Sequence, residues 1–179
     1  MPWVIDQRHS QIGFAIKHMM FTSVRGIFHR YHATIDIAPH DLVASHFSGA
    51  IEVASIDTHE PTRDEHLRSA DFFDVATYPT IDYRSTKIEA LGGNRFRVTG
   101  DLTMHGVTRP VVVEGEYAGG PYRDPDGTLR TGFSAAGDLN RKDFGLTWNA
   151  ALETGGVLVG EAVHVQLDVE LMWQEDAAA

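Results

Sequence analysis

The stretch RFRVTGDLTMHGVTRPVVVEGEY, residues 95–117, carries the clearest structural signal in this chain. Apolar or small residues occupy every second position over residues 96–104, and polar residues stand between them. The alternation returns over residues 111–117, after a His105-Gly106 pair that is typical of a tight turn. Because successive side chains of a strand point to opposite faces, this pattern predicts two hairpin-connected strands with one apolar face.

The same period of two recurs on both sides of this stretch. Short turns join most of the alternating segments, which predicts an all-β chain with about eight to ten antiparallel strands. A sheet with one apolar face has to cover that face, and long strands joined by hairpins favour a closed barrel over a sandwich. The further alternating segments are residues 12–16, 24–37, 47–53, 81–83, 133–139 and 163–173.

Three further elements are predicted from local sequence patterns. A short helix is predicted at about residues 63–70, because Thr62 and Glu65 have the spacing of a capping box, in which each side chain bonds a first-turn backbone N–H. Residues 18–22 break the alternation and indicate a single helical turn. Residues 24–37 alternate without interruption and predict one strand of roughly 45 Å.

The predicted helix needs the barrel, because a helix this short is marginal alone. We expect it to cap or plug the barrel, with Leu67, Phe72 and Phe73 facing inward. Small residues on the apolar faces of several strands leave part of the bore unfilled, although strand glycines also relieve bending at barrel corners. A long, narrow cavity results, suited to a chain-like ligand. The small residues are Ala33, Gly49, Gly100, Gly115, Ala135 and Gly137.

Composition narrows the functional classes. The chain has 179 residues with a hydrophobic fraction of 42%, which fits one domain at residues 1–174 followed by a tail at 175–179. The absence of cysteine excludes disulfides and thiol chemistry. The net charge of −10 opposes nucleic-acid binding. There is no signal peptide and no apolar run of membrane-spanning length, so we expect a cytoplasmic protein without stable membrane insertion.

Ten histidines raise the alternative of a metal-dependent or hydrolytic enzyme. His59, Asp64 and His66 could gather at the start of the predicted helix, and Asp71 and Asp74 could act as general acid–base groups. Charged residues at helix ends and solvated loop carboxylates are commoner explanations of the same residues. No nucleophile elbow, P-loop or dinucleotide-binding fingerprint is present in the sequence. The enzyme alternative based on the His59/Asp64/His66 region stays open.

Several motifs, in order, make the chain resemble the YceI-like family, the lipocalin-like polyisoprenoid-binding proteins, over residues 3–173. The most distinctive run is RDEHLRS at 63–69 with DFFD at 71–74, and further matches are GDLTMHGVT at 100–108 and NRKDFGL at 140–146. The resemblance implies an extended, lipocalin-like, eight-stranded antiparallel β-barrel. It also implies a homodimer and a bore that holds a polyisoprenoid, an isoprenoid quinone or a fatty-acid derivative.

We therefore expect a non-enzymatic carrier or store for a long amphiphilic lipid, with neither cofactor nor metal. A ligand-free structural or dimerisation module is a further alternative. Arg63, Asp64, Asp71 and Arg141 are interpreted as structural residues that pin the helix and loops to the barrel. The candidate ligand-binding residues are apolar or aromatic, with one histidine. They are Phe14, Ile16, His18, Met19, Met20, Phe21, Ile27, Leu67, Phe72, Phe73, Phe96, Leu102, Phe133, Phe144 and Trp148.

Overall fold

The computed structural model describes residues 3–38, 41–153 and 155–174, so the predicted tail at 175–179 lies outside the described residues. The strands are β1 (Trp3–Ile5), β2 (Gln11–His18), β3 (Thr22–Phe28), β4 (Tyr31–Asp36), β5 (His46–Glu52), β6 (Ile56–Asp57), β7 (Thr80–Gly92), β8 (Arg95–Met104), β9 (Val107–Tyr117), β10 (Tyr122–Arg123), β11 (Leu129–Asn140) and β12 (Val159–Trp173). The helical elements are α1 (Pro61–Arg68) and the 3-10 turns η1 (Leu42–Ala44), η2 (Val53–Ser55) and η3 (Arg141–Phe144).

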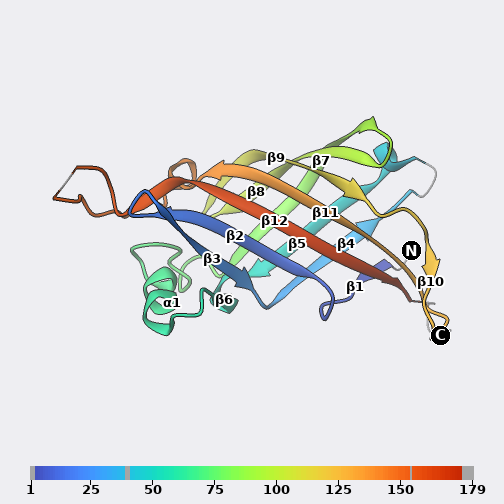
Figure 1. The fold of residues 1–179 in the computed structure, drawn as a ribbon, viewed down its shortest axis with the longest axis horizontal. Helices are drawn as coiled ribbons and strands as arrows, with labels where there is room; N and C mark the ends of the chain where they lie inside the picture. The colour runs from blue at the N-terminus through green and yellow to red at the C-terminus, as the bar shows by residue number, and fades with distance from the viewer. Residues whose placement is uncertain (1–2, 39–40, 154, 175–179) are drawn as a thin grey trace.

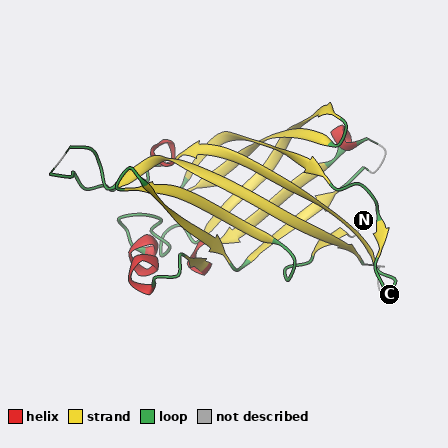
Figure 2. Cartoon of the chain, viewed as in Figure 1, coloured by secondary structure: helices red, strands yellow, loops and turns green. Residues whose placement is uncertain are grey.

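The strands close into a barrel (Figure 1; Figure 2). The hydrogen-bonded circuit runs β11–β9–β8–β7–β5–β4–β1–β12 and returns to β11, so eight strands make the ring. The short β1 covers one end of β12, and β2 pairs with the rest of β12 and continues the wall into β3. All these pairings are antiparallel. The predicted eight-stranded antiparallel barrel is confirmed.

Residues 95–117 form the β8–β9 hairpin. Met104 pairs with Val107 across the two-residue turn, and both turn residues, His105 and Gly106, have positive φ. A turn of this kind matches the right-handed twist of the flanking strands, which is why a glycine stands there. The alternation in β8 places Phe96 and Met104 in the buried core.

The prediction of one long strand at residues 24–37 is wrong. The strand β3 ends at Phe28 and pairs with β2 and β6, whereas β4 begins at Tyr31 and pairs with β1 and β5. Two residues lie between the strands, so the alternation shifts by one position. Phe28 and Tyr31 consequently both face the interior, while Ile27, predicted to share the face of Tyr31, does not.

The helical turn predicted at residues 18–22 is also wrong. These residues form the tip of the β2–β3 hairpin, where His18 pairs with Thr22. Met19 and Met20 have φ values of 49° and 68°. Two successive left-handed residues reverse the chain more tightly than a helical turn would, and they keep the two strands in register.

The predicted helix is present, but it starts and ends two residues earlier than expected. The capping residue is Glu60, whose carboxylate accepts hydrogen bonds from the backbone N–H groups of Thr62 and Arg63 at 3.2 and 2.6 Å. Pro61 occupies the first turn, where its fixed φ suits a helix and its missing N–H costs nothing. The Thr62/Glu65 capping box is therefore wrong: Thr62 lies inside the helix.

The core follows the bore of the barrel in three clusters. One lies against the α1 segment and contains Phe28, Ile56 and Phe144, and a second surrounds Phe96 and Val113. The third closes the end that carries the two termini, with its buried residues Trp3, Ile35, Val169 and Leu171. Residues of all three clusters and of the α1 segment line a cavity in the bore.

Candidate functional site

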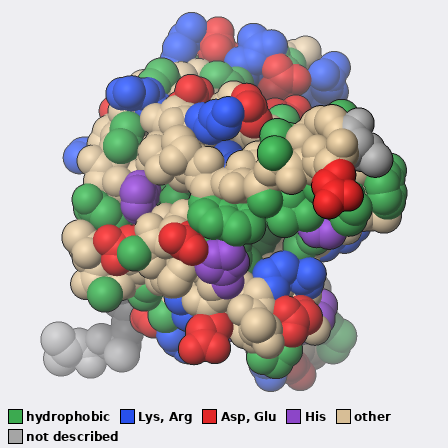
Figure 3. Space-filling view, turned by 90° about the vertical axis from the view of Figure 1, so that its left-hand side faces the viewer, with side chains coloured by type: hydrophobic (Ala, Val, Ile, Leu, Met, Phe, Trp, Pro, Cys, Tyr) green, Lys and Arg blue, Asp and Glu red, His purple; other side chains and the backbone are tan. Residues whose placement is uncertain are grey.

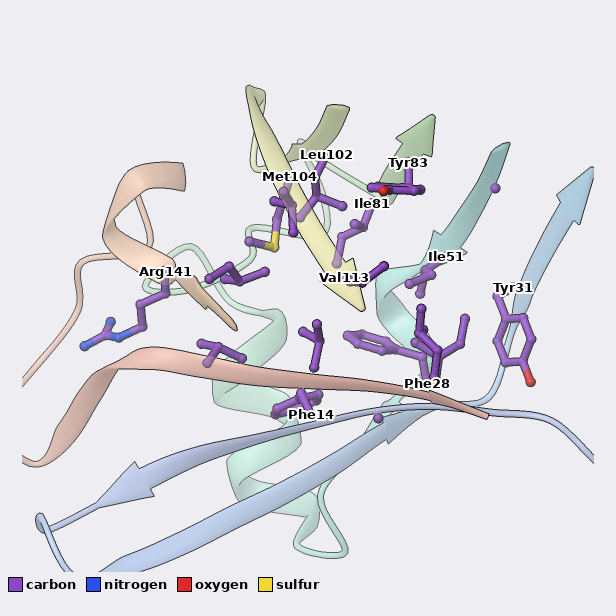
Figure 4. Close-up of a pocket in the computed structure, with 18 of the residues that line it drawn as sticks. Phe14, Phe28, Tyr31, Ile51, Ile81, Tyr83, Leu102, Met104, Val113 and Arg141 are labelled. Atoms are coloured by element: carbon purple, nitrogen blue, oxygen red, sulfur yellow. The ribbon is translucent and has the colours of Figure 1, made fainter. Parts of the chain in front are cut away.

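The barrel encloses a cavity of about 430 Å³ whose wall is almost entirely apolar. This volume lies within the range of small-molecule binding sites. Figure 4 shows Leu102 and Met104 of β8 facing Phe14 of β2 and Phe28 of β3 across the cavity, with Arg141 at one end. Because opposite walls come from strands distant in sequence, the cavity exists only once the barrel has closed.

Most of the predicted ligand-binding residues line this cavity. Leu67, Phe72 and Phe73 of the helix segment line the cavity. The prediction that this segment docks on the barrel with these side chains facing inward is therefore confirmed. The predicted residues on the wall are Phe14, Ile16, His18, Leu67, Phe72, Phe73, Phe96, Leu102, Phe133 and Trp148. Whether they contact a ligand stays a prediction.

Five predicted residues lie elsewhere, for identifiable reasons. Ile27 lies on the other face of β3 because of the interruption after Phe28. Phe144 is 1% exposed and packs in the core behind the wall. The remaining three, Met19, Met20 and Phe21, form the exposed tip of the β2–β3 hairpin.

The small inward residues explain less of the cavity than expected. A side chain at Gly100 would collide with the ring of Tyr83, which already fills that space. Gly115 and Gly137 closely approach the backbone of neighbouring strands. Ala33, Gly49 and Ala135 do line the cavity. Some strand glycines thus allow close packing, and only part of the small set creates open volume.

The cavity opens at the end of the barrel that holds α1. Seen from this end, hydrophobic side chains surround a hollow, with histidine and basic side chains beside it (Figure 3). Trp148 packs against His66 and Phe72, with ring centroids 4.8 and 5.2 Å apart. His66 is also hydrogen-bonded to Asp71 at 2.9 Å. This aromatic group joins the helix segment to the loop after η3 at the mouth.

Arg141 holds that loop from inside. Its guanidinium donates to the carbonyl oxygens of Leu146, Trp148, Val159 and Gly160, which ties the loop to the start of β12. The side chain is 3% exposed, and this burial lowers the pKa of Arg141 from its ordinary value. None of the described residues supplies it with a carboxylate hydrogen-bond partner. These contacts match the structural role expected for Arg141.

The charged groups on the cavity wall have one sign. The cavity wall includes Lys17, Arg63 and Arg141, and no acidic residue among the described ones lines it. Three histidines, His18, His32 and His66, are also on the wall. The charged side chains on the wall are thus basic, whereas the whole chain has a net charge of −10. The predicted ligand-binding set did not include Lys17, His32, Arg63, His66 or Arg141. Apart from His18 it was chosen for apolar and aromatic character, and Arg63 and Arg141 were interpreted as structural residues.

The residues of the enzyme alternative have separate partners. Asp64 is buried and accepts hydrogen bonds from the backbone N–H and hydroxyl of Thr58. His59 is exposed and lies 3.6 Å from Asp57, while His66 bonds Asp71. Among the described ranges, the group whose geometry could hold a metal ion is a different one, Asp6, His9 and Glu170.

A guanidinium already occupies that group. Arg130 donates to Asp6 at 2.8 Å and also bonds Asp124 and Glu170. The hydrogen bonds from Arg130 and then His9 hold the pKa of Asp6 well below its usual range. The cluster joins β11, β12 and the segment after β1, at the end of the barrel away from α1. Its donor set fits an internal ion pair better than a bound cation.

Tyr83 is the exception to good hydrogen bonding at the wall. Its hydroxyl is the buried side-chain polar atom without a partner in the part of the chain that the structure describes. Burial, and secondarily the charge of Asp101, raises the pKa of Tyr83 to about 12. The ring covers Gly100, so the hydroxyl is buried as a consequence of strand packing.

No helix in residues 3–38, 41–153 and 155–174 is long and apolar enough to cross a membrane.

Comparison with known proteins identifies relatives with similar sequences and solved structures with the same fold. A UPF0312 protein of Staphylococcus epidermidis is 36% identical over 165 residues, covering 92% of this chain and 94% of the relative. The crystal structure of BcnA from Burkholderia cenocepacia has a TM-score of 0.80 at 24% identity, with 93% of this chain and 98% of that chain covered.

A polyisoprenoid binding domain from Saccharophagus degradans, described as implicated in plant cell wall breakdown, has the same fold. Its TM-score is 0.71 at 14% identity, over 96% of this chain and 98% of that chain. The sequence model of the YceI-like domain matches residues 3–171, which is nearly the whole of the barrel. The closed barrel, the apolar bore and these matches agree, and the chain belongs to the YceI-like family.

Proposed function

We propose that this protein binds one long amphiphilic lipid in its barrel and carries or stores it unchanged, without a metal or cofactor. The candidate ligands are a polyisoprenoid, an isoprenoid quinone or a fatty-acid derivative. The observation that carries the proposal is the enclosed apolar cavity of about 430 Å³. The similar domain described as polyisoprenoid-binding supports the same ligand class.

Simple energetics favour a chain-like ligand. Burying an alkyl chain gains about 0.8 kcal/mol for each CH₂ group, whereas association costs roughly 4–15 kcal/mol. Three or four isoprene units offset most of that cost without any polar contact. Affinity should therefore depend mainly on the length of the chain, and shape should matter more than chemical detail.

The polarity of the wall suggests how the ligand lies. The aromatic cluster around Phe96 and Phe133 suits the apolar tail, because it lies deep in the bore. Arg63 and His66 belong to the helix segment at the mouth and would face the polar end of the ligand. A ligand that lies with its head group at the mouth buries none of its own polar atoms in the bore.

The direct test is extraction of protein purified from its native host, followed by mass spectrometry of the bound lipids. We expect one long-chain amphiphile per protein. The delipidated protein should bind cis-parinaric acid and prenols, with affinity rising from geraniol through farnesol to geranylgeraniol. Absence of any bound lipid together with absence of binding in this series would refute the proposal.

A filled bore provides a sharper test. Ala135 lines the cavity, while Ala136, the next residue of β11, points to the opposite face. Ala135→Phe should shorten the bore, so that geranylgeraniol loses more affinity than geraniol does. Ala136→Phe adds the same ring outside and serves as the matched control. Equal binding of every prenol by both variants would contradict a ligand inside the barrel.

A further inference from the structure

Four of the exposed large apolar side chains among the described residues gather at the mouth of the cavity. Met20 and Phe21 are 65% and 72% exposed at the tip of the β2–β3 hairpin. Met19 is partly exposed beside them, and Val157 is exposed on the neighbouring loop. We call these four residues the mouth patch. Exposed methionine and phenylalanine side chains of this size are unusual on a surface unless it contacts another apolar body.

The two loops of the mouth patch form one surface. The backbone N–H of Met19 donates to the carbonyl oxygen of Leu158 at 2.8 Å. A side chain at Gly156 would collide with the sulfur of Met20, so the hairpin tip and the loop touch. His18 and Leu158, the immediate neighbours of the patch, line the cavity. The apolar surface is thus continuous from the patch into the bore.

The charges on the two loops that carry the patch balance, unlike those of the whole chain. Residues 15–25 and 142–162, which include these loops, contain three basic and three acidic side chains. They are Lys17, Arg25, Lys142, Asp143, Glu153 and Glu161. The helix segment at the same end is acidic, because residues 57–75 contain six acidic and two basic side chains. An anionic lipid surface would repel this acidic segment beside the patch, whereas a zwitterionic surface has no net charge that opposes the approach.

We propose that the mouth patch docks on the surface of a zwitterionic lipid bilayer, so that ligand passes between the membrane and the cavity without crossing water. This inference rests on the proposed lipid-binding function. The Met20 and Phe21 side chains enter the interfacial region of one leaflet, as the apolar side chains of peripheral proteins do. The strand β1 and the last residues of β12 lie at the opposite end of the barrel (Figure 1).

The absence of cysteine allows a site-specific test of docking. Phe21→Cys and Val43→Cys each give a single site for an environment-sensitive fluorophore. Val43 is 50% exposed on η1 (Figure 2), at the end away from the patch. With phosphatidylcholine vesicles, the label at position 21 should shift to the blue and be quenched by brominated lipids, while the label at position 43 should not. The same response at both positions, or at neither, would overturn the proposal.

A variant pair links docking to ligand exchange. Met20→Asn with Phe21→Ser should lower partitioning onto phosphatidylcholine vesicles roughly a hundredfold, since each large side chain is worth about tenfold. Asparagine is chosen because it tolerates the positive φ at position 20. Val43→Ser is the control and should partition like the unchanged protein. Transfer of cis-parinaric acid between vesicles should slow in the double variant only.

The readouts separate this inference from the proposed function. If cis-parinaric acid binds equally to all variants in vesicle-free buffer, the cavity is intact and only docking is being compared. If the unchanged protein binds that probe but no vesicle, the docking proposal fails while lipid binding stands. If no variant binds the probe, the proposed function fails, whatever the vesicle result. Loss of self-association in the double variant, without vesicle binding by the parent, would identify a second copy as the occupant and overturn the proposal.

Discussion

Arg130 links three acidic residues that lie far apart in the sequence. Asp6 is 2% exposed, and its carboxylate depends on the guanidinium for compensation. Removing one partner of such a pair leaves an uncompensated buried charge, which is strongly destabilising. We expect Arg130→Met to lower the urea midpoint of unfolding by roughly 1–2 M. Arg97→Met, which removes a cation from an exposed pair with Glu114, should lower it by less than about 0.5 M. Equal shifts would contradict this ranking.

The same cluster predicts how stability depends on pH. The folded state holds the pKa of Asp6 below its usual value of 3.8, chiefly through Arg130, so the unfolded state binds more protons in acid. The resulting stabilisation is fully present above the unfolded pKa and is lost as pH falls through the folded pKa. Chemical denaturation between pH 7 and pH 2 should therefore show a decline below about pH 4. In Asp6→Asn the decline should be shallower, and an unchanged slope would exclude Asp6 as its source.

Tyr83 offers a prediction of the opposite sign. Its hydroxyl is buried without a partner, whereas its ring covers Gly100. Tyr83→Phe keeps the ring and removes the unsatisfied group, so the free energy of unfolding of the ligand-free protein should rise by about 1 kcal/mol. Thermal and urea denaturation measure this change. A loss of stability would reveal a hydrogen bond that the hydroxyl makes in solution.

At the level of elements, α1 is held by side chains that bond backbone groups. Asp64 accepts from Thr58, Arg63 donates to Thr58, and Arg68 donates to the carbonyl oxygens of Ala54 and Ile56. These bonds fix the helix to the chain just before it, on the segment that includes η2 and β6. These side-chain bonds attach the helix locally, so we expect it to open without unfolding the barrel.

Asp64→Ala tests this attachment. The variant leaves the buried Thr58 groups without an acceptor, which costs about 1–3 kcal/mol. Hydrogen exchange should accelerate over residues 58–75 and stay unchanged in β8 and β9, because the barrel ladder is intact. Glu65→Ala, an exposed substitution on the same helix, is the control. Uniform acceleration along the whole chain would instead show that the helix and the barrel unfold together.

At the level of the whole molecule, the bore couples ligand binding to stability. A ligand that binds only the folded state adds about 2.7 kcal/mol to the free energy of unfolding at a hundredfold excess over its Kd. We expect delipidated protein to melt at a lower temperature and to recover on addition of geranylgeraniol. Ala135→Phe should melt with little response to that prenol. Equal recovery in Ala135→Phe would place the ligand outside the bore.

The architecture was predictable because strand alternation is a local property. Every second residue of β8 faces the same way wherever the strand lies, so period and turn residues alone predict an all-β chain with a covered apolar face. The family motifs then specify the eight-stranded barrel. The same local signals located the helix near residue 63, and ten of the ligand-binding residues predicted on the strands, the helix segment and the loops do line the cavity.

Other features depend on contacts between distant segments, which no local pattern contains. The shift between β3 and β4 arises because one strand pairs with β2 and the next with β5, and it reverses the face of Ile27. Tyr83 filling the space at Gly100, Arg130 joining three carboxylates, and Arg141 reaching carbonyls across the mouth all follow from barrel closure. Sequence periodicity reports which residues are buried, whereas barrel closure sets which partners they meet and how much of the bore stays open.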